Sequence, residues 1–343
     1  MLNYIRVSSH DTRNLLFVVG IFLFSVFDMV HRYILYLMGF FDRLPDVVEV
    51  YSPMAHGVLA GGDLYIVHWD NRPPMFQFLN IGAAATGEYT LAFYLAIGVA
   101  NAVTAVLIWK LTSRHYVRSV AIVAGILYMF ALPVVEGRMI DARLFSNVFI
   151  LCGFLLSSPA YSGISIAIAG LFHQYAVFSI PIVVFYHNNN GIKNSVSWVI
   201  KFCVAGLATV GISYGIVGAI WGIDSLSHAI RYTFFGSARY VGVHSDRVLS
   251  IVGDPLVWFG NEWQVWRNHS LYYLFSGVAV WSWYKKDSFN RTVPVFATGL
   301  VLLALPRLLR NIPRYNILPL PFETILAAVG IMYFYQLYHD DQS

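Results

Sequence analysis

Charged residues are scarce in this chain. Asp, Glu, Lys and Arg make up 12% of the 343 residues, and the mean hydropathy is +0.62. A soluble domain has about 25% charged residues, so this composition excludes a soluble globular fold. The formal net charge is only +4, which in an apolar chain reflects the anchoring of loops at a membrane surface. We therefore expect a membrane protein without a nucleic-acid partner.

Cysteine is also nearly absent. The two thiols, Cys152 and Cys203, lie inside apolar runs, and the chain has neither a CxxC motif nor the Cys/His spacing typical of metal sites. A disulfide framework is thereby excluded, and solenoid-type repeats and low-complexity tracts are also lacking. We expect no obligatory cofactor; a divalent metal could bind to the acidic residues, but no ligand set stands out.

Long apolar runs are abundant. A helix needs about 20 apolar residues to cross a bilayer core roughly 30 Å thick, and such runs occupy most of the chain. We predict an all-α polytopic membrane protein, one transmembrane domain over residues 1–343, with about ten transmembrane helices. The count is nine if the run 161–186 is one long helix, and ten if it breaks at His173-Gln174, upstream of Pro181. The predicted spans are 14–38, 89–109, 118–134, 144–158, 161–186, 196–221, 271–284, 292–309 and 316–335.

The distribution of Lys and Arg predicts the orientation, because short cytoplasmic loops are enriched in these residues. Basic residues precede the first span and recur at 110–118, 193 and 285–286. These four segments share a side only if an even number of spans separates them. Three predicted spans separate the basic segments at 110–118 and 193, and splitting 161–186 into two makes this number even. We therefore expect both termini in the cytoplasm. The compact loops favour a prokaryotic cell membrane.

Polar residues then concentrate on the outer side. Two long segments, the first outer loop (40–87) and the second outer loop (222–269), are expected to carry short amphipathic helices, and two short segments, 136–143 and 306–315, accompany them. This asymmetry favours an enzyme that works at the outer face. A transporter or lipid-linked-sugar flippase is the alternative, although the internal repeats common in transporters are not evident. A non-catalytic scaffold and a polymerase or ligase of surface polysaccharide also remain open.

Three stretches carry a resemblance to a known family. The first outer loop contains DVVEVY at 46–51, GGDLY at 61–65 and WDNRPP at 69–74. GLFHQY at 170–175 and PRLLRNIPRYNILPLP at 306–321 follow in order. Together they resemble the polyprenol-phosphate-sugar-dependent glycosyltransferases with the C-type membrane fold, and most of all the dolichyl-phosphate-mannose protein mannosyltransferase group.

The resemblance implies a reaction and a catalytic base. Such enzymes move a sugar, mannose among them, from a polyprenyl or dolichyl phosphate to a hydroxyl of a glycan, lipid or protein acceptor at the outer face. A carboxylate in the first outer loop deprotonates the attacking hydroxyl. Asp46 is our choice, and Glu49 stays the alternative because Asp46 precedes Tyr51 by five residues where the family has four. The expected partners are the lipid-linked donor, the acceptor and membrane lipids.

Arginine suits a phosphate because its planar fork donates paired hydrogen bonds. Arg72 and Arg314 match the family pattern, and His173 stands where a Lys is common. Arg138 shares the segment 136–143 with Asp141 and Arg143, while interfacial anchoring is the alternative for any single Arg. The candidate ligands of the donor phosphate are Arg72, Arg138, His173, Arg307, Arg310 and Arg314. The candidates for binding sugar or acceptor are Tyr51, Tyr65, Asp70, Tyr240, Trp263 and Tyr315, although aromatic residues also gather at membrane interfaces.

Overall fold

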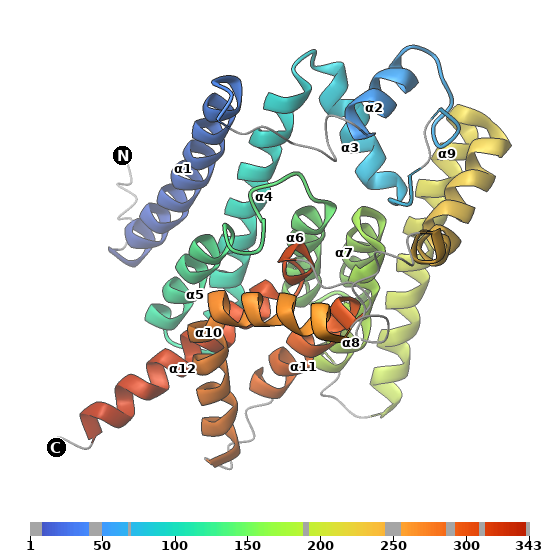
Figure 1. Cartoon of the computed structure of the whole chain (residues 1–343). Helices are drawn as coiled ribbons and strands as arrows, with labels where there is room; N and C mark the ends of the chain where they lie inside the picture. Colours follow the sequence, from blue (N-terminus) through green and yellow to red (C-terminus); the bar gives the residue numbers. More distant parts are fainter. Residues whose placement is uncertain are drawn as a thin grey trace, which may run out of the picture.

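A computed structural model describes residues 9–40, 50–67, 70–187, 192–243, 255–285, 292–308 and 313–340. Helices dominate these segments, and no strand occurs in them (Figure 1). The prediction of an all-α chain is therefore confirmed over the described part. The helices are α1 (Ser9–Leu37), α2 (Ser52–Leu59), α3 (Pro74–Ala85), α4 (Tyr89–Thr112), α5 (Arg118–Ala131), α6 (Ala142–Leu155), α7 (Pro159–Phe172), α8 (Ile180–His187), α9 (Ile192–Val243), α10 (Pro255–Lys285), α11 (Thr292–Ala304) and α12 (Leu320–Asp340). The short 3-10 helices are η2 (Gln174–Ser179), η4 (Leu305–Leu308) and η5 (Pro313–Asn316).

Four helical segments of the described chain are long and apolar enough to cross a membrane. They are Asn14–Leu37, Tyr89–Thr112, Ser195–Gly236 and Leu320–Tyr338. Five further apolar helices have 10–17 residues each, which is shorter than the roughly 20 that a straight crossing requires. A helical protein of membrane character is thus supported by length and composition, whereas the count of about ten spans stays a prediction.

The predicted break in the run 161–186 is confirmed. Helix α7 ends at Phe172, and His173 adopts an extended backbone with φ −149° and ψ 120°. The chain resumes as η2 and then α8, in which Pro181 lies in the first turn. Proline is tolerated there because the N–H groups of the first turn have no partner within the helix.

The second outer loop, 222–269, contains helices, as expected, but they join the flanking helices. The second part of α9 runs from Gly222 to Val243, and α10 begins at Pro255, well before the span predicted from 271. Gly222 interrupts α9 with a non-helical backbone of φ +86°, a conformation that glycine adopts without the steric cost of a Cβ. Apolar residues follow it at helical spacing, namely Ile223, Leu226, Ile230 and Phe234.

The core lies between α4, α5, α6 and α12. Phe154 of α6, for example, packs edge to face on Phe322 of α12, with ring centroids 5.5 Å apart, and both rings are fully buried. Helices α1, against α4, and α9, against α7, lie at the periphery (Figure 1), and apolar side chains on both are exposed. Phe27 and Leu207 are each 72% exposed, as expected for side chains that contact lipid rather than water.

Small residues allow two helix pairs to approach closely. A Cβ on Gly330 of α12 would collide with the backbone carbonyl of Phe275 in α10, and a Cβ on Gly163 of α7 would collide with that of Phe202 in α9. Contacts of this kind are typical of helix pairs in membranes, where van der Waals packing replaces the hydrophobic effect.

Candidate functional site

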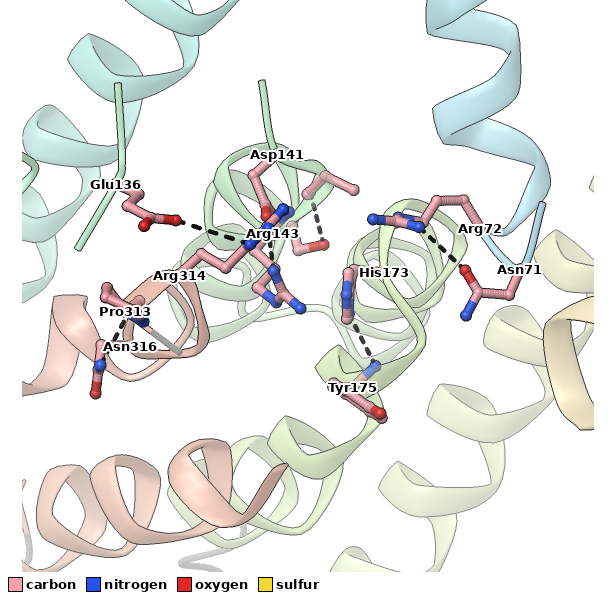
Figure 2. A network of polar contacts seen from close by, with 12 residues as sticks. Asn71, Arg72, Glu136, Asp141, Arg143, His173, Tyr175, Pro313, Arg314 and Asn316 are labelled. Atoms are coloured by element: carbon pink, nitrogen blue, oxygen red, sulfur yellow. Dashed lines mark hydrogen bonds and ion pairs between the residues drawn. The ribbon is translucent and has the colours of Figure 1, made fainter. Parts of the chain in front are cut away.

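Polar and charged side chains from four distant segments meet at one end of the helices (Figure 2). They come from the loop between α2 and α3, the start of α6, the break between α7 and η2, and η5. Helix termini gather such residues because the first N–H groups and last C=O groups of a helix need partners. We call the group formed by Arg72, Arg143 and His173 the basic triad.

Arg72 is held from several sides. Its Nη1 lies 3.3 Å from Asp70 Oδ1 and donates to Asn71 Oδ1 at 3.0 Å, and its guanidinium lies 5.2 Å from the centre of the Tyr51 ring. The Tyr65 hydroxyl donates to the Arg72 backbone carbonyl at 2.8 Å. Burial by itself would lower the pKa of Arg72, but the Tyr51 phenol and the Asp70 carboxylate raise it above its usual value. Arg72 therefore carries a permanent charge.

A buried chain of hydrogen bonds ends at Asp70, the ion-pair partner of Arg72. Gln77 Nε2 donates to Asp70 Oδ2, Asn80 Nδ2 donates to Gln77 Oε1 at 3.5 Å, and the Tyr89 hydroxyl donates to Asn80 Oδ1 at 2.6 Å. Gln77 and Asn80 are fully buried and Asp70 is 3% exposed. Asp70, predicted to bind sugar or acceptor, is thus occupied in orienting Arg72.

Asp141 and Arg143 open helix α6. Asp141 caps the helix, because its Oδ1 accepts a hydrogen bond from the Arg143 backbone N–H at 2.8 Å. Its Oδ2 lies 2.6 Å from Arg143 Nη1. The Arg143 guanidinium also stacks over the Tyr315 ring at 4.2 Å, and the residue is only 4% exposed. Such contacts fix the direction of the guanidinium.

His173 lies between the two arginines (Figure 2). Its Nδ1 accepts the backbone N–H of Tyr175 at 3.3 Å, which places the ring proton of a neutral imidazole on Nε2. Burial and the charges of Arg143 and Arg72 lower the pKa of His173 well below its usual value. His173 is therefore a neutral hydrogen-bond donor at physiological pH.

Arg314 and Tyr315 complete the group from η5. Arg314 Nε lies 3.7 Å from Glu136 Oε2, and both side chains are about one-third exposed. The Tyr315 ring lies between the Arg143 guanidinium and the Tyr175 ring, whose centroid is 6.0 Å away. Arg314 is thus the most accessible of the arginines at this end that the structure describes.

The arrangement suits an anion. The buried guanidinium of Arg143 and the partly buried guanidinium of Arg72 flank a neutral imidazole donor, a combination that can bind phosphate oxygens through charge-assisted hydrogen bonds. The residues that the structure describes contain no group of three His, Cys, Asp or Glu side chains placed to hold a metal ion.

The structure brings together seven of the fourteen predicted site residues and places three elsewhere, while four are not described. The seven are Tyr51, Tyr65, Asp70, Arg72, His173, Arg314 and Tyr315. Tyr65, predicted to bind sugar or acceptor, is 1% exposed and supports Arg72. Arg138 forms an ion pair with Asp28 of α1 at 2.8 Å. Arg307 donates to the Tyr273 hydroxyl at 3.4 Å, and Trp263 is 70% exposed on α10. The residues that lie outside the described part are Asp46, Glu49 and Arg310, together with the side chain of Tyr240.

In segment 136–143, Arg143 lies in the basic triad, whereas Arg138, a predicted phosphate ligand, pairs with Asp28, and a phosphate-binding role for Arg138 stays a prediction. Arg143 directly follows the Asp141-Ala142 start of a helix, and an acidic N-cap before an apolar run is a visible helix signal. Gln77 and Tyr175 were also missed. Gln77 lies close to Pro74 in the first turn of α3, where a polar residue could have been expected to face the preceding loop.

Comparisons with known proteins give no further guide to the site. No protein-family model, no curated protein and no solved structure matches this chain.

Proposed function

We propose that the protein is an integral membrane glycosyltransferase that uses a sugar linked to a polyprenyl or dolichyl phosphate. The basic triad at one end of the helices carries this proposal. A phosphate diester joined to a sugar becomes a monoester when the sugar leaves, and the added negative charge needs fixed positive groups. Arg72 and Arg143 are held in place by Asp70 and Asp141 and meet that need without reorganisation.

The proposed reaction is a direct displacement. A carboxylate takes the proton of the acceptor hydroxyl, the acceptor oxygen bonds to the anomeric carbon, and the bond from that carbon to the phosphate oxygen breaks. The electron pair stays on the phosphate, which is released on its lipid. Asp46 is the proposed base and Glu49 the alternative. Glu49 precedes Tyr51 by two residues, and the Tyr51 ring lies against Arg72, so either acid belongs to the segment that leads into the site.

The proposal includes the topology. About ten spans with both termini in the cytoplasm would put the basic triad at the outer face of the membrane, consistent with a prokaryotic cell membrane. The five short apolar helices and residues 271–284 of α10 supply the additional crossings, because neighbouring helices and bound lipid can shield a short span. The acceptor is a hydroxyl of a glycan, lipid or protein; mannose is one of the candidate sugars.

Transfer by the purified protein tests the proposal. The protein in lipid nanodiscs is supplied with a radiolabelled polyprenyl-phosphate sugar and a panel of hydroxyl acceptors. We expect Asp46→Asn to lower transfer by about 100-fold or more while leaving the binding of polyprenyl phosphate unchanged. Glu88→Gln is the matched control, because Glu88 is an exposed acid next to the first outer loop and lies on the same side of the membrane in the proposed topology.

Binding separates the possible outcomes. If Glu49→Gln abolishes transfer and Asp46→Asn does not, the enzyme class stands and Glu49 is the base. If polyprenyl phosphate binds no more tightly than its alcohol, and Arg72→Gln and Arg143→Gln leave binding unchanged, the proposal is wrong. If the protein reconstituted in lipid vesicles moves the lipid-linked sugar across the bilayer without transferring the sugar, a flippase would be supported instead.

A further inference from the structure

A second polar feature lies at the other end of the helices. Helix α6 starts at the basic triad and has 14 residues, so its far end is roughly 20 Å away. There, a cleft of about 560 Å³ opens between the α4–α5 turn and the ends of α10, α11 and α12. Its volume lies within the range of small-molecule binding sites, about 300–1,000 Å³.

The α4–α5 turn contributes a polar and basic part of the lining. Arg114 Nη2 donates to the Leu155 carbonyl at 2.8 Å and Nη1 to the Phe154 carbonyl at 3.5 Å, so the guanidinium is anchored on the end of α6. A guanidinium has five N–H groups, and these two bonds leave others for a ligand. His115 also lines the cleft, and its Nε2 lies 2.7 Å from the Tyr186 hydroxyl.

Arg114 supplies the positive charge of the cleft, and the neighbouring His115 stays neutral near pH 7. Burial and the charge of Arg114 lower the pKa of His115. Lys110 and Lys285 lie within a few residues of the lining, at the ends of α4 and α10. Helix α5 starts at the cleft, and its N-cap, Val117, has no polar side chain to satisfy the first N–H groups. No Asp or Glu is among the lining residues within the described segments.

Apolar side chains make up much of the rest of the lining. They are Val120, Trp283, Val293, Val329 and Met332, and the polar Ser282, Tyr333 and Gln336 lie among them. A free phosphate would use only the basic part of the lining and leave the apolar side chains exposed to water. A lipid with an anionic headgroup matches both parts, because its phosphate meets Arg114 while the first carbons of its chains contact the apolar side chains.

We infer that this cleft binds the phosphate headgroup of an anionic membrane lipid, with its acyl chains against the apolar lining residues. The inference is independent of the proposed transfer reaction, since the cleft lies at the opposite end of α6 from the basic triad. The occupant is chosen on charge complementarity and on the presence of both a guanidinium and apolar side chains in the lining.

Val117 provides a matched pair of test variants. Its side chain is 57% exposed at the N-cap of α5, so a polar replacement does not disturb the core. Val117→Glu and Val117→Gln have nearly the same shape and differ by one negative charge in the cleft. An acid at a helix N-terminus favours the helix, so Val117→Glu is expected to fold.

The experiment measures lipid binding to the full chain in a mild non-ionic detergent. Native mass spectrometry counts bound dioctanoyl phosphatidylglycerol, dioctanoyl phosphatidylcholine or inorganic phosphate. We expect phosphatidylglycerol to bind at least about fivefold more tightly than phosphatidylcholine, a preference that Val117→Glu removes and Val117→Gln retains. Equal binding of the two lipids, or equal loss in both variants, would overturn the inference. Inorganic phosphate that displaces phosphatidylglycerol at equal concentration would show a simple anion site and overturn the assignment to a lipid.

Discussion

The buried ion pair between Asp141 and Arg143 is open to a quantitative test. Both residues are less than 10% exposed, and the carboxylate has two bonds to Arg143, one to its guanidinium and one to its backbone N–H. Arg143→Met removes the first and leaves a buried carboxylate without its counter-charge. Removal of one partner of a buried pair costs about 3–5 kcal/mol of unfolding free energy. Loss of the stacking on Tyr315 adds roughly 0.5–2 kcal/mol.

The double variant tells whether the charge is the cause. Asp141→Asn removes the charge but keeps an N-cap residue, because Asn caps about as well as Asp. In Asp141→Asn/Arg143→Met no charge is buried, so we expect most of the loss in Arg143→Met to be recovered, with a coupling energy of about 2 kcal/mol or more. Reversible unfolding in mixed detergent and dodecyl sulfate, followed by circular dichroism, measures all four proteins.

A control pair and an opposing result make this test decisive. Glu136 and Arg314 are 3.7 Å apart and about one-third exposed, so Glu136→Gln is expected to cost less than about 1 kcal/mol. Additive effects of Asp141→Asn and Arg143→Met, within about 0.5 kcal/mol, would refute the reasoning. They would mean that solvent screens the pair and that Arg143 is not fixed by Asp141.

Three further predictions concern other parts of the structure. Because the pKa of His173 is lowered by folding, the unfolded chain binds a proton below about pH 6.5 and the folded chain does not. The free energy of unfolding therefore falls with decreasing pH, by up to about 1.4 kcal/mol per pH unit. His173→Gln should show a smaller fall in the same unfolding assay between pH 7.5 and 5. An equal pH dependence in the two proteins would contradict the neutral state of this histidine. Gly330→Ala should destabilise the chain by roughly 1–3 kcal/mol, because the new methyl group meets the backbone of α10. Gly277→Ala, which has open space around it, should be neutral or slightly stabilising. Similar values for the two variants would argue against the close approach of α10 and α12. Tyr65→Phe removes the hydrogen bond to the Arg72 carbonyl and should weaken polyprenyl-phosphate binding by about three- to tenfold. It should also lower the free energy of unfolding by about 1 kcal/mol. Unchanged binding in a calorimetric titration would show that Tyr65 does not position Arg72.

Much of the helical layout could be predicted from apolar runs and breakers. The boundaries of α4 and α5 lie within a few residues of the predicted spans, and the break at His173 follows from a polar pair inside an apolar run. In the second outer loop helices were expected, but the early start of α10 was not, because the polar residues after Pro255 keep its hydropathy low. The bend of α9 at Gly222 depends on a backbone conformation that the residue type permits but does not require.

The site was predicted in part. Arg72, His173 and Tyr315 were expected from motifs, and the structure brings them to one end of the helices. Asp70 and Tyr65, predicted to bind sugar or acceptor, contact Arg72, and their role toward a sugar stays a prediction. Asp46 and Glu49 lie outside the described residues, so the assignment of the base stays a prediction.

The sequence by itself determined that the chain is helical, apolar and rich in arginine between its apolar runs. Local patterns encode these properties, since each run needs only its own neighbours to form a helix. Tertiary structure alone decided that Arg143 joins Arg72 and His173 while Arg138 pairs with Asp28 of α1. Arg138 and Arg143 are five residues apart and chemically identical, and only the packing of helix ends from distant parts of the chain gives them different partners.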